Sequence, residues 1–445
     1  MRASHILVAA TLLACATAAP SLSLSVNAST GAFTLSSSTW PALSLSSAPP
    51  QLRVNGALTP LALASPPSTF NGADALGPFA GTTLSFAAAA GGAPLLVATL
   101  KAYTTRAAVG FAAAFPAAVA SNGTEATKDS TAAAFPAFAL PATSSLGFMQ
   151  WAGPFINQGV VGPRTGSFSA AGATSFSSGL ASGPIVLLDA TGAASLVLSA
   201  ASEFAAVSVA AEGGALNFGP LGSAAELPAG YAYETIAYLG AGVNEAMMTW
   251  GDAMMSKFGK PHGLSKSDFT NTHLIYNTDH GAYYYYNPTP EYVNYTGMLN
   301  AVGEYAASVG IPYRGVLLDS WCKFTRPTTR PRATLTRDSI FSSHLIQTGY
   351  FKGTGGGVKN WTAMPTIFDG GNAGIRALVD KFGWKVTAHN RWWSANTDYA
   401  RQNGGDFDFF IDSGKGVMAV PLSSEFWTWL LTQSVDEWGL TTYGT

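Results

Sequence analysis

The chain has 445 residues, of which 47% are hydrophobic and only 11% are charged, and its net charge is −2. This much apolar sequence can fill a large core and excludes a globally disordered chain. The near-neutral charge provides no basic surface of the kind that nucleic-acid binding requires, so the sequence predicts no nucleic-acid partner. The length allows two domains of the size that β-sandwiches and α/β barrels reach.

The first twenty residues have the pattern of a secretory signal peptide. Arg2 precedes an apolar run from Ile6 to Ala14, and small residues follow at 16–19, as signal cleavage requires. The run is too short to cross a bilayer, and no later segment reaches the roughly 18 continuous apolar residues that a membrane helix needs. We therefore predict a signal peptide over 1–20, a secreted or endomembrane-lumen protein and no membrane span in the mature chain. An uncleaved anchor is the alternative.

Other short motifs fit an exported protein without adding a catalytic centre. Four Asn-X-Ser/Thr sequons begin at Asn27, Asn122, Asn294 and Asn360. They suggest a glycoprotein, although sequons also arise by chance. Cys15 lies in the expected signal peptide, which leaves Cys322 without an internal disulfide partner. A nucleophilic Cys322 would need an activating base, and a packed thiol is the simpler interpretation. The histidines lack metal-ligand spacing, so we predict no metal and no cofactor.

The composition of the chain changes near residue 250. Residues 1–250 contain 6 Lys or Arg and 9 Asp or Glu, whereas residues 251–445 contain 17 and 16. Trp is distributed just as unevenly, with two before position 250 and nine from Trp250 onward. Two domains with different roles are therefore expected.

The first domain is expected over residues 21–243. It consists of short apolar runs separated by Gly, Pro, Ser and Asn. The clearest runs start at Gly31, Leu95, Ile185, Ala194 and Phe204. Strand-length runs at this spacing are typical of an antiparallel β-sandwich. The many Ala residues are poor strand formers and leave a helical alternative open, but Gly and Pro interrupt almost every window long enough for a helix.

The second domain is expected to be a partial (β/α) TIM-type barrel over residues 273–445, reached through a linker helix and connection over 244–272. Strand and helix patterns alternate in it. The expected strands lie at 273–279, 315–321, 384–391, 407–412 and 439–443, and the expected helices at 292–310, 374–383 and 426–435. Repeated βα units build a parallel sheet. The predicted fold class is thus multidomain, β followed by α/β.

Polar residues stand at the carboxyl ends of four of these predicted strands. They are Asp279, Asp319, His389 with Arg391, and Asp412. In (β/α)8 barrels the active site lies at this end of the strands, so we expect these side chains to share one rim. A strand-end Asp also often caps the following helix, and that reading stays open for each one.

Aromatic residues accompany these polar positions, among them Trp321, Trp393 and the run Tyr283–Tyr286. Carboxylates accept hydrogen bonds from sugar hydroxyls, and flat aromatic faces pack against the apolar side of a pyranose. Two carboxylates about 5–5.5 Å apart would support retaining glycoside hydrolysis. The pattern therefore favours a carbohydrate substrate or ligand, with ordinary core packing as the alternative for each aromatic residue.

Three segments resemble barrel-strand motifs of the α-galactosidase-like glycoside hydrolases. They begin at Asn277, Gly315 and Lys385 and read NTDHGAYYYY, GVLLDSWC and KVTAHNRWW. That superfamily commonly carries an N-terminal β-sandwich before a (β/α)8 barrel. The resemblance implies an α-glycoside substrate and a retaining mechanism.

The same resemblance implies roles for single residues. Asp319 and Trp321 match the element that holds sugar hydroxyls, and Asp279 would line the same pocket. Asp412 matches the nucleophile position, although Phe410 stands where the family usually has Lys. We expect Asp279, Asp319, His389 and Arg391 to orient the sugar, with Trp393 beside them as a further binding residue.

The predicted barrel is short. A complete one takes about 250 residues and eight strands, whereas residues 251–445 contain five expected strands. We therefore expect a barrel that is truncated in this chain, or completed by a partner, with no identifiable acid/base residue and no activity as it stands. The alternative function is a non-catalytic secreted carbohydrate-binding or wall-associated glycoprotein.

Overall fold

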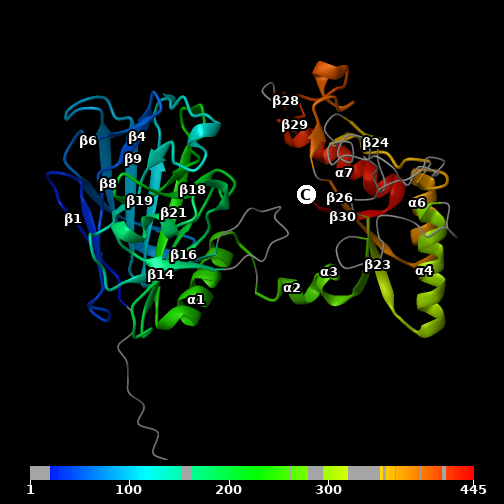
Figure 1. The fold of residues 1–445 in the computed structure, drawn as a ribbon, viewed down its shortest axis with the longest axis horizontal. Coiled ribbons are helices and arrows are strands. Elements are labelled where there is room, and N and C mark those ends of the chain that lie inside the picture. The colour runs from blue at the N-terminus through cyan, green and yellow to red at the C-terminus, as the bar shows by residue number, and fades with distance from the viewer. Residues whose placement is uncertain are drawn as a thin grey trace, which may run out of the picture. The chain divides into compact units, whose positions relative to one another are not determined.

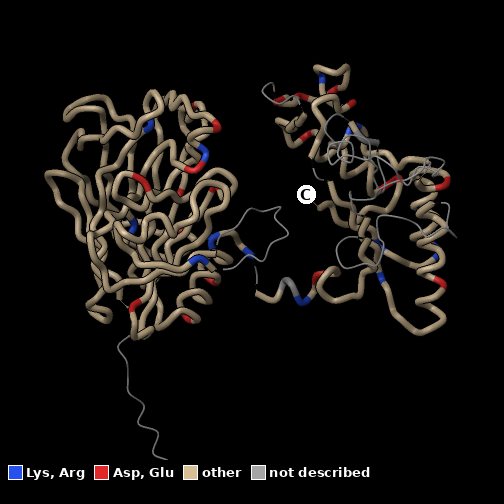
Figure 2. Tube along the Cα trace, viewed as in Figure 1, with Lys and Arg blue, Asp and Glu red and all other residues tan. Residues whose placement is uncertain are grey.

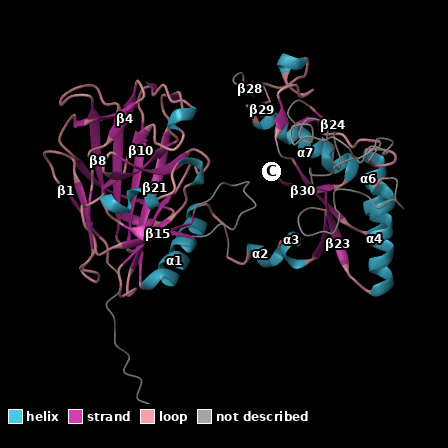
Figure 3. Ribbon diagram, viewed as in Figure 1, coloured by secondary structure: helices cyan, strands magenta, loops and turns pink. Residues whose placement is uncertain are grey.

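The computed structural model describes residues 21–151, 163–260, 262–278, 294–318, 351–353, 357–365, 367–390, 392–412 and 417–444. The chain divides into two compact units, residues 1–262 and 263–445 (Figure 1). The first unit is built almost entirely of strands, whereas the second mixes strands and helices (Figure 3). The expected signal peptide lies outside the described residues, so cleavage and export stay predictions.

One layer of the first unit is a ten-stranded antiparallel sheet. Its strands in spatial order are β15 (Pro163–Ser167), β14 (Gly147–Trp151), β16 (Ile185–Leu188), β17 (Ser195–Ala200), β21 (Ala232–Gly240), β10 (Ala108–Ala114), β9 (Leu96–Tyr103), β8 (Gly77–Ala87) and β6 (Ala62–Leu63), with β7 (Ser68–Asp74) also paired to β8. Strand β9 shows the pattern that predicts it. Leu96, Ala98 and Leu100 are buried, and the residues between them are partly exposed, because side chains alternate between the two faces of a sheet.

Shorter sheets supply the rest of the first unit. They are β1 (Ser23–Val26) with β2 (Phe33–Ser36) and β3 (Ser44–Ser46); β12 (Ala133–Ala134) with β4 (Gln51–Val54) and β5 (Ala57–Pro60); β13 (Ala137–Ala139) with β19 (Ala215–Pro220) and β18 (Val207–Glu212); and the pair β11 (Val119–Ala120) and β20 (Glu226–Leu227). Short 3-10 turns cover Glu125–Thr127, Ala170–Ser175 and Gly179–Ala181.

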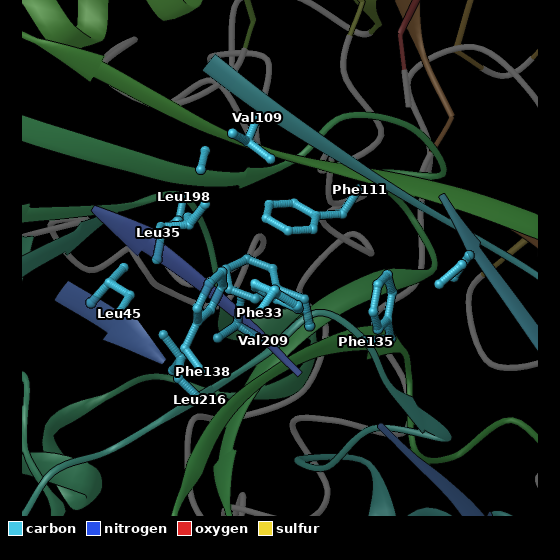
Figure 4. Close-up of a cluster of buried hydrophobic side chains, with 14 of the residues drawn as sticks. Phe33, Leu35, Leu45, Val109, Phe111, Phe135, Phe138, Leu198, Val209 and Leu216 are labelled. Carbon is cyan, nitrogen blue, oxygen red and sulfur yellow. The ribbon is translucent and has the colours of Figure 1, made fainter. Parts of the chain in front are cut away.

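A single apolar core joins these sheets to the large one (Figure 4). Phe33 on β2 lies 5.2 Å from Phe111 on β10 and 5.9 Å from Phe138 on β13, measured between ring centroids. Strands of both layers therefore bury their inner faces against each other, and the predicted β-sandwich is confirmed. Charged residues are sparse along the tube of this unit (Figure 2), in keeping with its composition.

Helix α1 (Gly242–Lys257) covers the outer face of the large sheet. Its residues Ala246 and Ala253 are fully buried and pack in a cluster with Val186, Val197 and Ile236. This explains why β17 is buried on both faces. The helix expected to link the two domains thus packs on the first of them, and the short helices α2 (Leu264–Ser267) and α3 (Phe269–Thr272) follow it.

A four-stranded parallel sheet forms the centre of the second unit. Its strands in order are β22 (Leu274–Asn277), β23 (Tyr313–Leu318), β26 (Lys385–His389) and β30 (Leu440–Gly444). Helices α4 (Tyr295–Val309), α6 (Asn372–Phe382) and α7 (Ser424–Trp438) accompany it (Figure 1). Each of these helices ends at a glycine in the left-handed conformation, which satisfies carbonyl groups of the last turn. This is the partial α/β fold that the sequence predicts.

The second unit contains a further sheet, whose strands alternate in sequence with those of the parallel sheet and correct one prediction. Its strands in order are β24 (Phe351–Lys352), β25 (Val358–Asn360), β27 (Trp393–Ser394), β29 (Met418–Pro421) and β28 (Phe409–Ile411); a 3-10 turn covers Arg401–Asn403. The run at 407–412 was expected to be a strand of the parallel sheet, but β28 pairs antiparallel with β29. The place beside β26 belongs to β30. A short apolar run predicts a strand but not its partner.

Candidate functional site

The parallel sheet has one buried apolar face and one more exposed face that carries several polar residues. Val316, Leu318, Val386, Ala388 and Leu440 belong to the buried core that the helices cover. Because side chains alternate along a strand, Leu317 and Thr387 lie on the opposite face, and a register shift between β26 and β30 places Thr442, and not Thr441, beside Thr387. One row of register partners crosses all four strands there: Asn277, Leu317, Thr387 and Thr442. All four are at least partly exposed.

His389 extends this polar face toward the carboxyl end of the sheet. It is the last residue of β26, two positions beyond Thr387, and pairs in register with Gly444 on β30. Neighbouring strands lie about 4.8 Å apart, so His389 and Thr387 on β26 and Thr442 on the adjacent β30 can reach one small ligand, whereas Asn277 lies two strands from β26. Amide, hydroxyl and imidazole groups both donate and accept hydrogen bonds, as recognition of a polyol requires.

Asn390 fixes the strand end next to His389. Its backbone N–H donates to the Gly444 carbonyl at 2.8 Å, and its side-chain Nδ2 donates to the Tyr443 hydroxyl at 2.7 Å. Asn390 is only 1% exposed, and its Oδ1 has no hydrogen-bond partner among the described residues. Burial raises the pKa of the Tyr443 phenol and outweighs the hydrogen bond from Asn390, which lowers it. A neutral Tyr443 therefore ties β30 to β26.

The described parts of the four parallel strands contain no Asp or Glu. Among the described residues, no group of three or more His, Cys, Asp or Glu is placed to hold a metal ion. This part of the site therefore supplies hydrogen-bonding groups for a ligand, while a carboxylate for catalysis would have to come from another segment.

Asp412, the predicted nucleophile, is not at the end of a parallel strand. It follows β28 in the second sheet, where its backbone N–H donates to the Met418 carbonyl at 3.0 Å. Met418 is in turn the register partner of Ser394 on β27, five positions after His389. The sequence prediction misplaced Asp412 because it assigned the strand at 407–412 to the parallel sheet. The catalytic role of Asp412 stays a prediction.

Trp393, predicted to bind sugar, belongs to the core. It is 3% exposed. Its ring centroid lies 5.2–6.3 Å from those of Trp361, Tyr399, Phe426 and Trp427. An indole surrounded in this way stabilises the fold and presents no open face to a ligand. Proximity to a strand end in sequence did not distinguish packing from stacking on a sugar.

Four predicted site residues lie outside the described residues: Asp279, Asp319, Trp321 and Arg391. Their binding roles stay predictions. The structure adds residues that sequence reasoning did not select, namely Asn277, Thr387, Thr442 and Asn390. The alternation of apolar and polar residues along 385–389 was the available signal for one of them, because it separates Thr387 from the buried Val386 and Ala388.

Solved structures with a similar fold include glycoside hydrolases. A variant of the GH36 α-galactosidase AgaA from Geobacillus stearothermophilus in complex with raffinose matches with a TM-score of 0.51 at 12% identity, over 91% of this chain and 57% of that chain. Ligand-free α-N-acetylgalactosaminidase NagBb from Bifidobacterium bifidum matches with a TM-score of 0.50 at 11% identity, over 94% and 68%. This chain thus spans less than two thirds of the α-galactosidase.

No protein-family model and no curated protein matches this sequence. The chain has an α-galactosidase-like glycoside hydrolase fold, which confirms the resemblance predicted from its strand motifs. Among the described residues, no helix is both long and apolar enough to span a bilayer.

Proposed function

We propose that the second unit binds an α-glycoside at the carboxyl ends of its parallel strands and acts as a glycoside hydrolase-like protein. The proposal is carried by the polar residues Asn277, Thr387 and Thr442 and by His389, all on the face of the sheet opposite the helices. (β/α) folds place their ligands at this end of the strands. The structural neighbours include an α-galactosidase crystallised with raffinose. That this chain binds an α-glycoside is part of the proposal.

In the proposed complex the chain's own groups hold the sugar and exclude water. His389, Thr387 and Asn277 hydrogen-bond hydroxyl groups of the glycon. Asp279, Asp319 and Arg391 follow Asn277, Leu317 and His389 by two positions in sequence, and we propose that they and Trp321 add further contacts. Hydrolysis with retention would need a carboxylate to attack the anomeric carbon. Asp412 is our candidate, because its pairing with Met418 links it to the strand that follows β26.

Binding without turnover is the second candidate function. One observation favours it: the described parts of the parallel strands lack a carboxylate, and the nearest predicted nucleophile lies in a different sheet. A protein that kept the hydrogen-bonding face and lost the nucleophile would still recognise the glycoside.

Titration and hydrolysis of 4-nitrophenyl α-D-galactopyranoside by the full chain test both functions. We expect His389→Ala to weaken binding about tenfold, since it removes one or two hydrogen bonds. Lys385→Ala, on the same strand and face but at its other end, should change it little. The absence of any binding by the wild-type chain would refute the proposal.

If the wild-type chain releases nitrophenolate, Asp412→Asn should lower the rate at least about a thousandfold, as loss of a nucleophile does. The exposed Asp406→Asn is the matched control. Unchanged turnover in Asp412→Asn would remove Asp412 from the mechanism. Binding without any release of nitrophenolate would support the second candidate.

A further inference from the structure

A groove of about 160 Å³ lies beside α7 and is not part of the strand-end site. On the helix side it is lined by Trp429, Gln433 and Glu437, and on the other side by Asn360, Thr362 and Tyr399. The three helix residues are spaced four apart, so they form one stripe along α7. The adjacent stripe, which contains Phe426 and Leu430, is buried in the core.

The aromatic part of the groove is rigid and accessible. Trp429 is 38% exposed. Its ring centroid lies 5.4 Å from that of Tyr399 and 5.1 Å from that of Phe407, so two rings fix its position. The backbone N–H of Trp361 donates to the Tyr399 hydroxyl at 2.8 Å. An indole that is held in place and still open offers an apolar surface at little entropic cost.

The polar part of the groove is equally ordered. Asn360 is held at both ends, because its Nδ2 donates to Asp398 at 3.2 Å and its Oδ1 accepts from the Tyr399 hydroxyl at 3.3 Å. One oxygen of Glu437 accepts from the Nδ2 of Asn372. Gln433, one turn before Glu437, is exposed on the same stripe. An amide and a carboxylate therefore stand next to an open indole.

We propose that this groove is a second carbohydrate site, which binds a single pyranose ring. Its volume is about five times the roughly 30 Å³ that a water molecule occupies in the liquid, which suits one sugar ring and not an extended chain. Glu437 disfavours an anion, and the polar stripe disfavours a wholly apolar ligand. A pyranose has an apolar face for Trp429 and hydroxyl groups for Gln433 and Glu437. The proposal rests on the groove's own residues and not on the strand-end site.

Fluorine NMR of the full chain labelled with 5-fluorotryptophan tests the proposal. Trp429→Phe identifies the Trp429 resonance, and methyl α-D-galactopyranoside and N-acetyl-D-glucosamine are titrated as probes. We expect this resonance to shift saturably with one of them, with a millimolar dissociation constant typical of about 4 kcal/mol of binding free energy. Gln433→Ala and Glu437→Gln should each weaken the binding about two- to tenfold.

Two controls separate this site from other effects. Asp436→Asn makes the same chemical change as Glu437→Gln at the neighbouring exposed position, which does not line the groove, and should leave the affinity unchanged. His389→Ala should also leave it unchanged, although it weakens strand-end binding. A Trp429 resonance that does not move with either sugar, or that responds identically in Glu437→Gln and wild type, would overturn the proposal.

Discussion

Asn390 shows how one residue can order the candidate site without contacting a ligand. It joins the ends of β26 and β30 through its backbone and its side chain, directly after His389. The strand end is thus held by a buried amide and a partly buried phenol. Tyr443 packs against Trp361 and Trp427, with ring centroids 5.3 and 5.4 Å away.

We expect Asn390→Ala and Tyr443→Phe each to lower the free energy of unfolding by about 1 kcal/mol, because each removes the same hydrogen bond. The double variant should cost clearly less than the sum of the two, as expected when two residues share one interaction. Chemical denaturation of all four proteins measures this. Simple additivity would show that the bond contributes nothing to stability.

Sequence reasoning at this scale predicted the position of His389 at a strand end, while its binding role stays a prediction, and it did not foresee the burial of Trp393. His389 lies within the predicted strand 384–391, where the period-two pattern indicates the face on which each side chain lies, and Trp393 comes two positions after it. Trp393 begins a new strand, β27, so the pattern no longer applies to it. Its burial depends on contacts with Tyr399 and with Phe426, which is 33 positions away in sequence. No local sequence pattern predicts these contacts.

Charged residues attach helix α1 to the sheet that it covers. Lys257, in the last turn of α1, forms an ion pair with Glu234 on β21. Glu234 also accepts from Lys101 on β9 at 2.9 Å. Burial by itself raises the pKa of the Glu234 carboxyl, but hydrogen bonds and charges from Lys257 and Lys101 outweigh it and hold the pKa below its usual value.

A carboxyl whose pKa is lower in the folded than in the unfolded protein stabilises the fold above its unfolded pKa, near 4.3 for Glu, and loses this effect as the pH falls through the folded pKa. We therefore expect the unfolding free energy of the wild type to decline as the pH is lowered below about 5. Glu234→Gln should show a shallower decline in urea denaturation between neutral and acid pH.

Glu226→Gln, at an exposed position of β20, serves as the control for this pH series and should keep the wild-type slope. Equal slopes for wild type and Glu234→Gln would show that the charge network does not contribute to acid sensitivity.

Elements with a clear period were predicted well from sequence. The expected helix 374–383 is α6 (Asn372–Phe382), and the expected strand at 384–391 is β26 (Lys385–His389). The error concerned pairing, since the run at 407–412 forms a strand in the other sheet. Strand formation depends on local residues, whereas the choice of partner depends on packing across the whole unit.

At the level of the whole chain, the described buried residues form separate cores. The main core of the first unit runs from Phe33 to Leu239 in sequence, and the core of the second unit from Tyr295 to Leu440. The change of composition near residue 250 predicted two such bodies. Each core contains its own large aromatic residues, so each unit has the means to fold cooperatively.

We expect thermal unfolding of the full chain to show two transitions, because multidomain chains commonly depart from two-state behaviour. Phe111→Ala removes a buried ring and should lower the unfolding free energy of the first unit by about 3–5 kcal/mol. Only one of the two transition temperatures should therefore fall. Trp393→Ala should lower the unfolding free energy of the second unit by a similar amount and so lower only the other transition temperature. Differential scanning calorimetry distinguishes this from a single transition that both variants shift.

The short connection between β26 and β27 limits which insertions and deletions this protein can accept. His389 ends one strand, Trp393 begins the next, and Asn390 between them is bonded to β30. With both flanks immobilised, the loop length is fixed. Adding or deleting a single residue there would exchange inward and outward side chains on one flank. Variants designed to alter the proposed sugar site should therefore replace residues in this stretch and keep its length.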